Sequence, residues 1–233
     1  MKAIAIITGK KNSSFKNKNI IKIFNKEIFL YPVDAAKKSK YLSEFYTSSD
    51  SKKILNVSRK KGFKSINRPS SLSRKNSKHS DVLAHALKNI KNLDDNDIVV
   101  VLLANCATIT TDWIDNCISK IKKDKSLSAV VPVTLDNDHH PLRAKKLKNG
   151  KLTSFFKNKK KISSNRQDLE NNYFLSHNFW VIKKKYLVRQ NGEPPWQFMG
   201  PKVAPYVLDF SIDIHNKRDV YLTKMWLKTF MKI

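Results

Sequence analysis

The segment Asp97–Leu103 (DIVVVLL) places the strongest constraint on the fold of this chain. It is apolar throughout after its first residue, so the strand that it predicts is buried on both faces. The run at residues 3–7 (AIAII) predicts a second short buried strand. Strands that are buried on both faces are typical of a mostly parallel sheet with helices on either side.

Amphipathic segments alternate with strand-like runs along most of the chain. The expected helices span residues 28–39, 52–61 and 79–91, followed by one capped by Thr110 or Thr111 and a last one capped by Asn216 with Asp219 at its third position. The other expected strands span 45–48, 63–66, 127–133 and 173–182. This alternation predicts an open α/β sandwich whose ligand binds at the carboxyl ends of the strands.

The alternation is interrupted between residues 136 and 205. Loops are expected around 138–143 (DHHPLR) and at the basic run 157–161, and a rigid turn at 194–196 (PPW). We interpret this part as an arm for subunit pairing or for substrate, inserted into a single domain that spans residues 1–233.

The formal charge of +27 could indicate a nucleic-acid-binding protein. The lysines, however, occupy almost every polar position, and arginine is scarce beside lysine, so a compositional drift explains the charge better than a binding stripe. No apolar run approaches the ~20 residues of a membrane span, and a signal peptide is not expected. Cys106 and Cys117 lie in apolar-periodic segments, which predicts two buried free thiols and a cytoplasmic protein.

A loop of small, amide and lysine residues, TGKKNSSFKNKN at positions 8–19, follows the first strand. At the carboxyl end of a strand such a loop suits a polyphosphate, because Gly9 and the serines let backbone N–H groups approach oxygens while Lys10 and Lys18 supply charge. The loop lacks both the Walker pattern and a dinucleotide fingerprint. The residues alone leave open that it is an ordinary lysine-rich surface loop.

Five segments, in this order, resemble the acylneuraminate cytidylyltransferases, the CMP-sialic acid synthetase family. GKKNSSFKNKN matches the family's A-R-x-N-S-K-G-x-x-x-K-N loop, and SSDSKKI its S-T-D-S-x-x-I. RPSSLS matches R-P-A-x-L-A, HHPL the same tetrapeptide, and SIDIHNKRD the family's S-I-D-I-D-T-x-x-D. The resemblance spans almost the whole chain and implies a Rossmann-like nucleotidyltransferase fold, a homodimer and a Mg²⁺-dependent reaction.

In the reaction that the resemblance implies, a hydroxyl of a nonulosonic (sialic-acid-like) or related acidic sugar attacks the α-phosphate of CTP and expels pyrophosphate. The resemblance makes Lys10, Lys18 and Asp213 the predicted catalytic residues, with Lys10 in the place of the family's loop arginine. The predicted nucleotide ligands are Gly9, Lys10, Asn12, Ser13, Lys18, Asn19, Arg68 and Asn105. The predicted sugar-side residues are His140, Arg143, Arg166 and Gln167, and the predicted Mg²⁺ ligands are Asp213 and His215.

The chain departs from the family pattern at several of these positions. His215 stands where the family has a second metal-binding aspartate, and imidazole is a poorer Mg²⁺ ligand than carboxylate. Ala104 replaces the glutamine that helps to recognise cytosine, so base choice must rest on backbone groups, Asn105 or something else. Phe174 replaces an arginine of the family. Arg166 and Gln167 are therefore the expected polar groups on the sugar side.

Simpler structural roles remain open for some of these residues. Arg68 could be an ordinary loop residue, and Asp213 could cap the last helix instead of binding a metal. His139 and His140 could be turn residues. Two alternative functions also remain: the same fold acting on another nucleotide or sugar, and a catalytically inactive basic module that binds nucleic acid or another anion.

Overall fold

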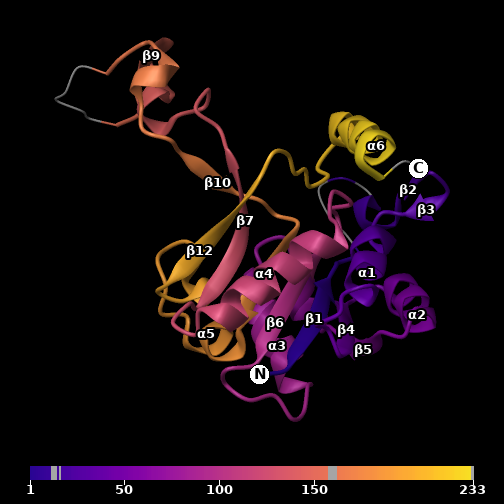
Figure 1. The fold of residues 1–233 in the computed structure, drawn as a ribbon. Helices are drawn as coiled ribbons and strands as arrows, with labels where there is room; N and C mark the ends of the chain where they lie inside the picture. Colours follow the sequence, from indigo (N-terminus) through magenta and orange to yellow (C-terminus); the bar gives the residue numbers. More distant parts are fainter. Residues whose placement is uncertain (12–14, 16, 157–161, 232–233) are drawn as a thin grey trace.

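A computed structural model describes residues 1–11, 15, 17–156 and 162–231. At its centre is an eight-stranded sheet in the order β10-β7-β11-β6-β1-β4-β5, with β12 also paired to β7 (Figure 1). All of its strands run in one direction except β10 and β11, which are antiparallel to their neighbours. The mostly parallel sheet, covered by helices, confirms the predicted α/β fold.

The elements follow each other in the expected alternation through the first half of the chain. The strands of the sheet are β1 (Ala3–Thr8), β4 (Glu44–Ser49), β5 (Lys64–Asn67), β6 (Ile98–Leu103), β7 (Ala129–Leu135), β10 (Tyr173–Leu175), β11 (Phe179–Lys183) and β12 (Val203–Leu208). The α-helices are α1 (Leu30–Lys37), α2 (Lys52–Lys60), α3 (His79–Lys88), α4 (Thr111–Lys123), α5 (Lys184–Arg189) and α6 (Lys217–Met231).

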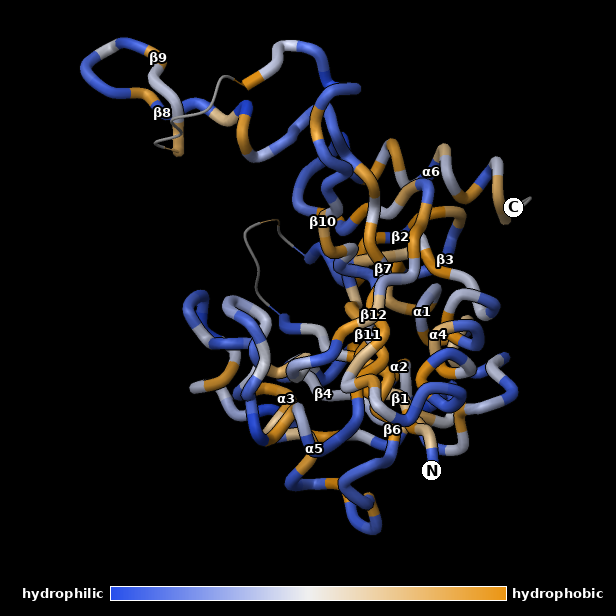
Figure 2. Tube along the Cα trace, turned by 60° about the vertical axis from the view of Figure 1, so that its left-hand side comes forward, coloured by the Kyte–Doolittle hydropathy of each residue, from blue (hydrophilic) through white to orange (hydrophobic). Residues whose placement is uncertain are grey.

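Two hydrophobic cores lie on opposite faces of the sheet, because successive side chains of a strand point to opposite sides. On β1, Ala3, Ala5 and Ile7 pack with α1, α2 and α4, whereas Ile4 and Ile6 pack with α3 and α5. The central strand β6 divides its side chains in the same way. Figure 2 shows these central strands as hydrophobic segments. The apolar runs of the sequence are therefore the two-sided interior of the sheet.

The predicted helix starts are marked by side-chain caps. The hydroxyl of Ser51 accepts a hydrogen bond from the backbone N–H of Ile54 (3.4 Å) at the start of α2. The hydroxyl of Thr110 accepts one from Trp113 (3.3 Å) at the start of α4. Thr110 is therefore the cap of this helix, and Thr111 is its first residue.

The part that leaves the sheet is shorter than the expected 136–205. Residues 173–208 return to the sheet, where the strand expected over 173–182 is divided into β10 and β11. Residues 136–156 and 162–172 form what we call the arm, which carries the two-stranded hairpin β8 (Lys145–Lys148) and β9 (Lys151–Ser154). Figures 1 and 2 both show the arm projecting from the body of the molecule.

A third, smaller core joins α6 to the region after the first loop. There the hairpin of β2 (Lys22–Ile23) and β3 (Lys26–Glu27) packs against α6 through Ile23, Trp226 and Leu227. The rings of Trp113 on α4 and Trp226 lie 5.7 Å apart, centroid to centroid. This packing holds the chain segment before α6 against the loops at one end of the sheet. Within the described ranges, no helix is long and apolar enough to cross a membrane.

Candidate functional site

The carboxyl ends of β1, β4 and β6 meet at one edge of the sheet, where two loops close on each other. The N–H of Gly9 donates to the carbonyl of Ser48 (3.3 Å), and the N–H of Ala104 donates to that of Thr8 (3.1 Å). A Cβ atom on Gly9 would lie only 2.7 Å from the Cβ of Ala104. Glycine is therefore required at position 9 because the loop after β1 approaches the end of β6 so closely.

The predicted phosphate loop turns back toward the sheet through Asn19. The buried amide of Asn19 donates to the carbonyl of Lys10 (2.8 Å), and the N–H of Lys11 donates to a carboxylate oxygen of Asp50 (2.7 Å). The first contact joins the two ends of the loop to each other, and the second ties the loop to the segment just before α2. Asn12 and Ser13, which were predicted to bind the nucleotide, lie outside the described residues.

Lys18 lies in a partly buried position close to several charged groups. Burial lowers the pKa of its ammonium, and Lys10 acts in the same direction, while Asp213 and Asp219 oppose the shift. The structure therefore brings the three predicted catalytic residues, Lys10, Lys18 and Asp213, into one electrostatic neighbourhood. Two neighbouring cations suit a ligand with several negative charges.

The segment that carries Asp213 is fastened to the loop after β6 on both sides of that residue. The carbonyl of Ile212 accepts hydrogen bonds from the thiol of Cys106 (3.0 Å) and the hydroxyl of Thr108 (3.2 Å). The N–H of Ile214 donates to the carbonyl of Asn105 (2.9 Å). Asp213 is thus held between two anchored neighbours. Cys106 is a buried free thiol, as predicted, and burial raises its pKa to about 12.

The carboxylate of Asp213 has two side-chain partners. Its Oδ2 lies 2.8 Å from Nε2 of His215 and accepts a hydrogen bond from the amide of Asn105 (3.4 Å). The amide of Asn105 also donates to the carbonyl of Ile214 (3.5 Å). This predicted nucleotide ligand therefore also orients the segment that carries Asp213.

The cap of α6 is made by other residues. The side chain of Asn216 accepts from the N–H of Asp219 (3.2 Å), and Oδ2 of Asp219 accepts from the N–H groups of Asn216 (3.0 Å) and His215 (2.7 Å). This reciprocal arrangement is the predicted cap. Asp213 is therefore not occupied in capping the helix and is available to the site.

Asp213 and His215 could hold a divalent cation as a pair. Oδ2 and Nε2 share a hydrogen bond of 2.8 Å, so a cation bound by both atoms would replace the proton between them. Two neighbouring ligands of an octahedral cation with bonds of about 2.1 Å lie about 3.0 Å apart, so the two atoms need to move little. Among the described residues, no group of three or more His, Cys, Asp or Glu side chains could enclose a metal. The pair therefore fits a cation that takes its other ligands from water and from substrate phosphates.

Arg68, directly after β5, is the buried cation of the site. Its Nη2 donates to the carbonyl of Ser48 (2.6 Å), its Nε approaches the hydroxyl of the same residue (3.3 Å), and its N–H donates to the carbonyl of Ser49 (3.0 Å). The residue is only 8% exposed, and this burial lowers its pKa to about 10, while Asp50 opposes the shift. Arg68 is thus a fixed positive charge beside the end of β4.

Two histidines that the sequence analysis did not single out lie beside these residues. Nε2 of His79 is 3.1 Å from the hydroxyl of Thr8, and its ring faces that of Trp180 (5.4 Å between centroids). Burial, with Arg68 and His177 nearby, lowers the pKa of His79 to about 4. No local pattern marks these histidines, because polar residues at the ends of strands and helices are common in this chain.

The ring of His177 stands edge-on to Trp180 and Trp196, at 5.7 and 5.4 Å. Burial lowers its pKa, an effect that Asp213 opposes and His215 reinforces. His177 is therefore part of the aromatic cluster with Trp180 and Trp196, and it is near enough to Asp213 and His215 to be influenced by their charges.

The predicted sugar-side residues lie on the arm. Nδ1 of His140 accepts from the N–H of Leu142 (3.2 Å), so this side chain stabilises a turn. Arg166 forms an ion pair with Asp138 (2.9 Å) and, with Gln167, lines a cavity of about 360 Å³. Arg143 lies exposed near His140 in the same part of the arm.

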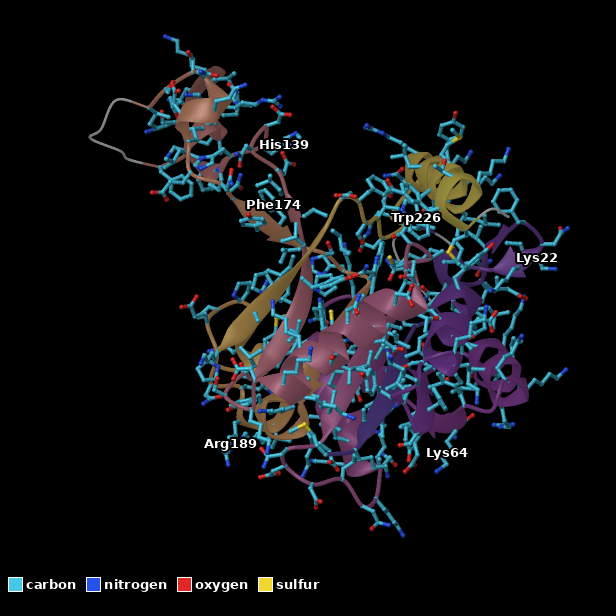
Figure 3. All side chains as sticks on the ribbon, in the orientation of Figure 1. Lys22, Lys64, His139, Phe174, Arg189 and Trp226 are labelled. Carbon is cyan, nitrogen blue, oxygen red and sulfur yellow. The ribbon has the colours of Figure 1, made fainter. Side chains whose placement is uncertain are left out.

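Figure 3 shows where this group lies relative to the rest of the molecule. His139 and Phe174 are at the base of the arm, away from Trp226 and α6. None of the contacts given above joins the predicted sugar-side residues to Lys10, Lys18 or Asp213.

Comparison with known proteins gives a family for almost the whole chain. A family model described as cytidylyltransferase matches residues 4–231. The chain is also 30% identical, over 175 residues, to a Helicobacter pylori protein named pseudaminic acid cytidylyltransferase and UDP-2,4-diacetamido-2,4,6-trideoxy-beta-L-altropyranose hydrolase. This match covers 74% of the chain and 33% of the relative, so the chain spans about a third of the length of that protein.

Solved structures with the same fold include a CMP:2-keto-3-deoxy-manno-octonic acid synthetase complexed with CTP. That structure matches with a TM-score of 0.72 at 12% identity, over 100% of both chains. The 4-diphosphocytidyl-2C-methyl-D-erythritol synthase from Anaerococcus prevotii DSM 20548 matches with a TM-score of 0.69 at 13% identity, over 97% of this chain and 96% of the other. At these identities the likeness establishes the fold.

Proposed function

The chain belongs to the cytidylyltransferase family, as its motifs predict, and we propose that it transfers CMP from CTP to a nonulosonic acid or a related acidic sugar. The observation that carries this proposal is the convergence of Lys10, Lys18 and Asp213 at the carboxyl edge of the sheet. We place the reaction in the cytoplasm as part of the same proposal.

The residues of the site suit a triphosphate. Gly9 lets the backbone of the loop lie close to β6, and Lys10 and Lys18 bring two positive charges to the same place. Arg68 adds a third cation whose position is fixed by Ser48. In phosphoryl-type transfers most of the catalysis comes from positioning and from stabilising the charge that develops. In this proposal the lysines hold the triphosphate for attack on its α-phosphorus.

The reaction forms one bond and breaks one. A hydroxyl oxygen of the sugar acid bonds to the α-phosphorus and loses its proton, while the α-phosphorus separates from the bridging oxygen and pyrophosphate leaves. Asp213 and His215 would hold a divalent cation, expected to be Mg²⁺ by resemblance, and such an ion would supply Lewis-acid stabilisation of negative charge. Asn105 keeps Asp213 in position for this role.

The residue after β6 bears on the choice of base. Ala104 is 1% exposed and its methyl group packs toward Gly9, so position 104 offers no polar side chain to a base. This observation favours an alternative in which the same fold uses another nucleotide. A competition assay that showed preference for UTP or ATP over CTP would support that alternative.

We also propose that the arm pairs two copies of the chain. An isolated two-stranded hairpin is marginally stable in water, yet Leu147 and Leu152, which face each other across β8 and β9, are 74% and 73% exposed. Phe155 and Phe156, which follow β9 directly, are also exposed. A second copy that covered the surface would stabilise both arms.

The direct test is release of pyrophosphate. Purified protein is mixed with CTP, Mg²⁺ and a panel of nonulosonic and related acidic sugars, and pyrophosphate is measured for each. The proposal predicts CTP-dependent release with at least one acid of the panel. If none of them supports release while the protein is folded, the proposal fails.

A further inference from the structure

The pair formed by Asp213 and His215 combines two kinds of metal ligand. Oδ2 of Asp213 is a hard anionic oxygen, and Nε2 of His215, at 2.8 Å from it, is an imidazole nitrogen. The backbone of both residues is fixed, because Ile214 between them is anchored to Asn105 and the N–H of His215 donates to Asp219. The two donor atoms are therefore held side by side by the fold.

Among the described residues, no thiol and no further imidazole joins this pair. The buried thiol of Cys106 donates to the carbonyl of Ile212, so it is directed to the backbone and not to the pair. The ring of His177 is packed against Trp180 and Trp196. A cation here takes one carboxylate oxygen and one imidazole nitrogen from the protein.

This mixture of ligands discriminates between divalent cations. Mg²⁺ strongly prefers oxygen ligands in a near-ideal octahedron, whereas transition-metal ions also bind imidazole well. Mn²⁺ accepts the carboxylate and phosphate oxygens that suit Mg²⁺, and as a first-row transition-metal ion it loses less than Mg²⁺, a hard cation of oxygen ligands, when one ligand is an imidazole nitrogen. We propose that His215 gives this site a preference for Mn²⁺ over Mg²⁺.

This inference rests on the proposed function, because it takes the phosphates of a bound nucleotide as the remaining ligands. The described residues contain no group of three or more His, Cys, Asp or Glu side chains that could hold a metal. The protein therefore supplies two ligands to the cation and not a complete set. Cation binding should therefore depend on nucleotide.

The test measures binding without turnover. The full chain is mixed with a CTP analogue whose α–β bridge is a methylene group, and Mn²⁺ is titrated by electron paramagnetic resonance, with Mg²⁺ as the competitor. The variant is His215→Asp. The control is His139→Asp, because Nδ1 of His139 lies 2.7 Å from a carboxylate oxygen of Asp136 in a similar pair on the arm.

The quantity compared is the ratio of Mn²⁺ affinity to Mg²⁺ affinity. We expect this ratio to be about tenfold higher or more in the wild-type complex than in the His215→Asp complex. His139→Asp should leave the wild-type ratio unchanged. An equal ratio in wild type and His215→Asp would overturn the inference while leaving nucleotide-dependent cation binding, and hence the proposed function, intact. If the analogue neither binds nor promotes cation binding, the inference and the proposed function both fail.

A second readout does not depend on the variant folding. Wild-type protein is labelled with ¹⁵N at histidine, and electron spin echo modulation is recorded on its Mn²⁺–analogue complex. Nitrogen modulation that changes with the label is expected if imidazole binds the cation. A spectrum without a histidine nitrogen would overturn the inference.

Discussion

The amide of Asn105 donates to the carboxylate of Asp213 at 3.4 Å, although the two residues are 108 positions apart in the sequence. This contact connects the loop after β6 to the segment before α6, and the backbone hydrogen bond from Ile214 to Asn105 lies beside it. Asn105→Ala should therefore loosen Asp213 without removing it. We expect weaker cation binding in the presence of nucleotide, by about 10- to 100-fold, as measured by Mn²⁺ titration.

Asn116→Ala is the matched control for that change. Asn116 lies on α4, where its amide donates to the hydroxyl of Tyr206 at 3.1 Å, and it touches none of the site residues. Cation affinity should stay at the wild-type value in this variant. Equal losses in both variants would mean that Asn105 acts through general stability.

Lys18→Ala should impair the chemistry far more than the fold. Lys18 is a partly buried cation that shares its surroundings with Lys10 and Asp213. Removing a charge that stabilises a developing oxyanion costs about 10²–10³ in kcat. The measurement is the rate of pyrophosphate release. Lys22→Ala is the control, because Lys22 is an exposed lysine on β2 at the periphery of the molecule (Figure 3), and its variant should keep wild-type activity.

Gly9→Ala should destabilise the protein, because the new Cβ would lie 2.7 Å from the Cβ of Ala104. Overpacking of this kind costs about 1–3 kcal/mol, which urea unfolding can measure. The double variant Gly9→Ala/Ala104→Gly removes the clash, so part of the loss should return. Strictly additive effects of the two substitutions would contradict the close packing of these positions.

His79 should make stability depend on pH. Its pKa is about 4 in the folded protein against an ordinary value of 6.5, because burial disfavours the imidazolium. The unfolded chain therefore binds a proton first as the pH falls, and stability is lost between about pH 6.5 and pH 4. The difference in unfolding free energy between pH 7 and pH 5 should be smaller in His79→Gln than in wild type. If the change in unfolding free energy between pH 7 and pH 5 were equal in the two proteins, His79 would not be the cause of the pH dependence.

The arm should be needed for self-association. Leu147→Asp/Leu152→Asp places two charges on the exposed apolar surface of the β8–β9 hairpin. The proposed dimer should dissociate, as sedimentation equilibrium can show. Val188→Asp introduces the same charge at a valine of α5 that is also exposed, and should leave the association state unchanged. A wild-type protein that is monomeric at assay concentrations would refute the dimer.

Much of the fold could be predicted from the sequence, because buried parallel strands leave a local signal. The runs that became β1 and β6 are apolar over their whole length, and Thr110 and Asn216 mark helix starts by their own side chains. β12 was missed for a physical reason. Pro205 lies inside it, and proline is expected only in strands at the edge of a sheet, which is where β12 pairs with β7 alone.

The site was predictable only in part. The loop of Lys10 and Lys18 follows a clear strand, so its place could be inferred, and Asp213 lies in a motif. The partners of Asp213 depend on contacts between distant segments, as with Asn105, and no spacing in the sequence reports them. His79 and His177 were missed for the same reason, since their neighbours Thr8 and Trp196 come from other elements.

The most direct test of the central claim is thermal unfolding with each of CTP, UTP, ATP and GTP in the presence of a divalent cation. A ligand that binds only the folded state at ~100 times its Kd adds about 2.7 kcal/mol. The account predicts that CTP stabilises the wild-type protein and Lys22→Ala most strongly, and that Lys18→Ala loses this effect. Equal stabilisation by all four nucleotides that disappears with added salt would show a basic surface binding charge, and would contradict the assignment of a cytidine nucleotide site.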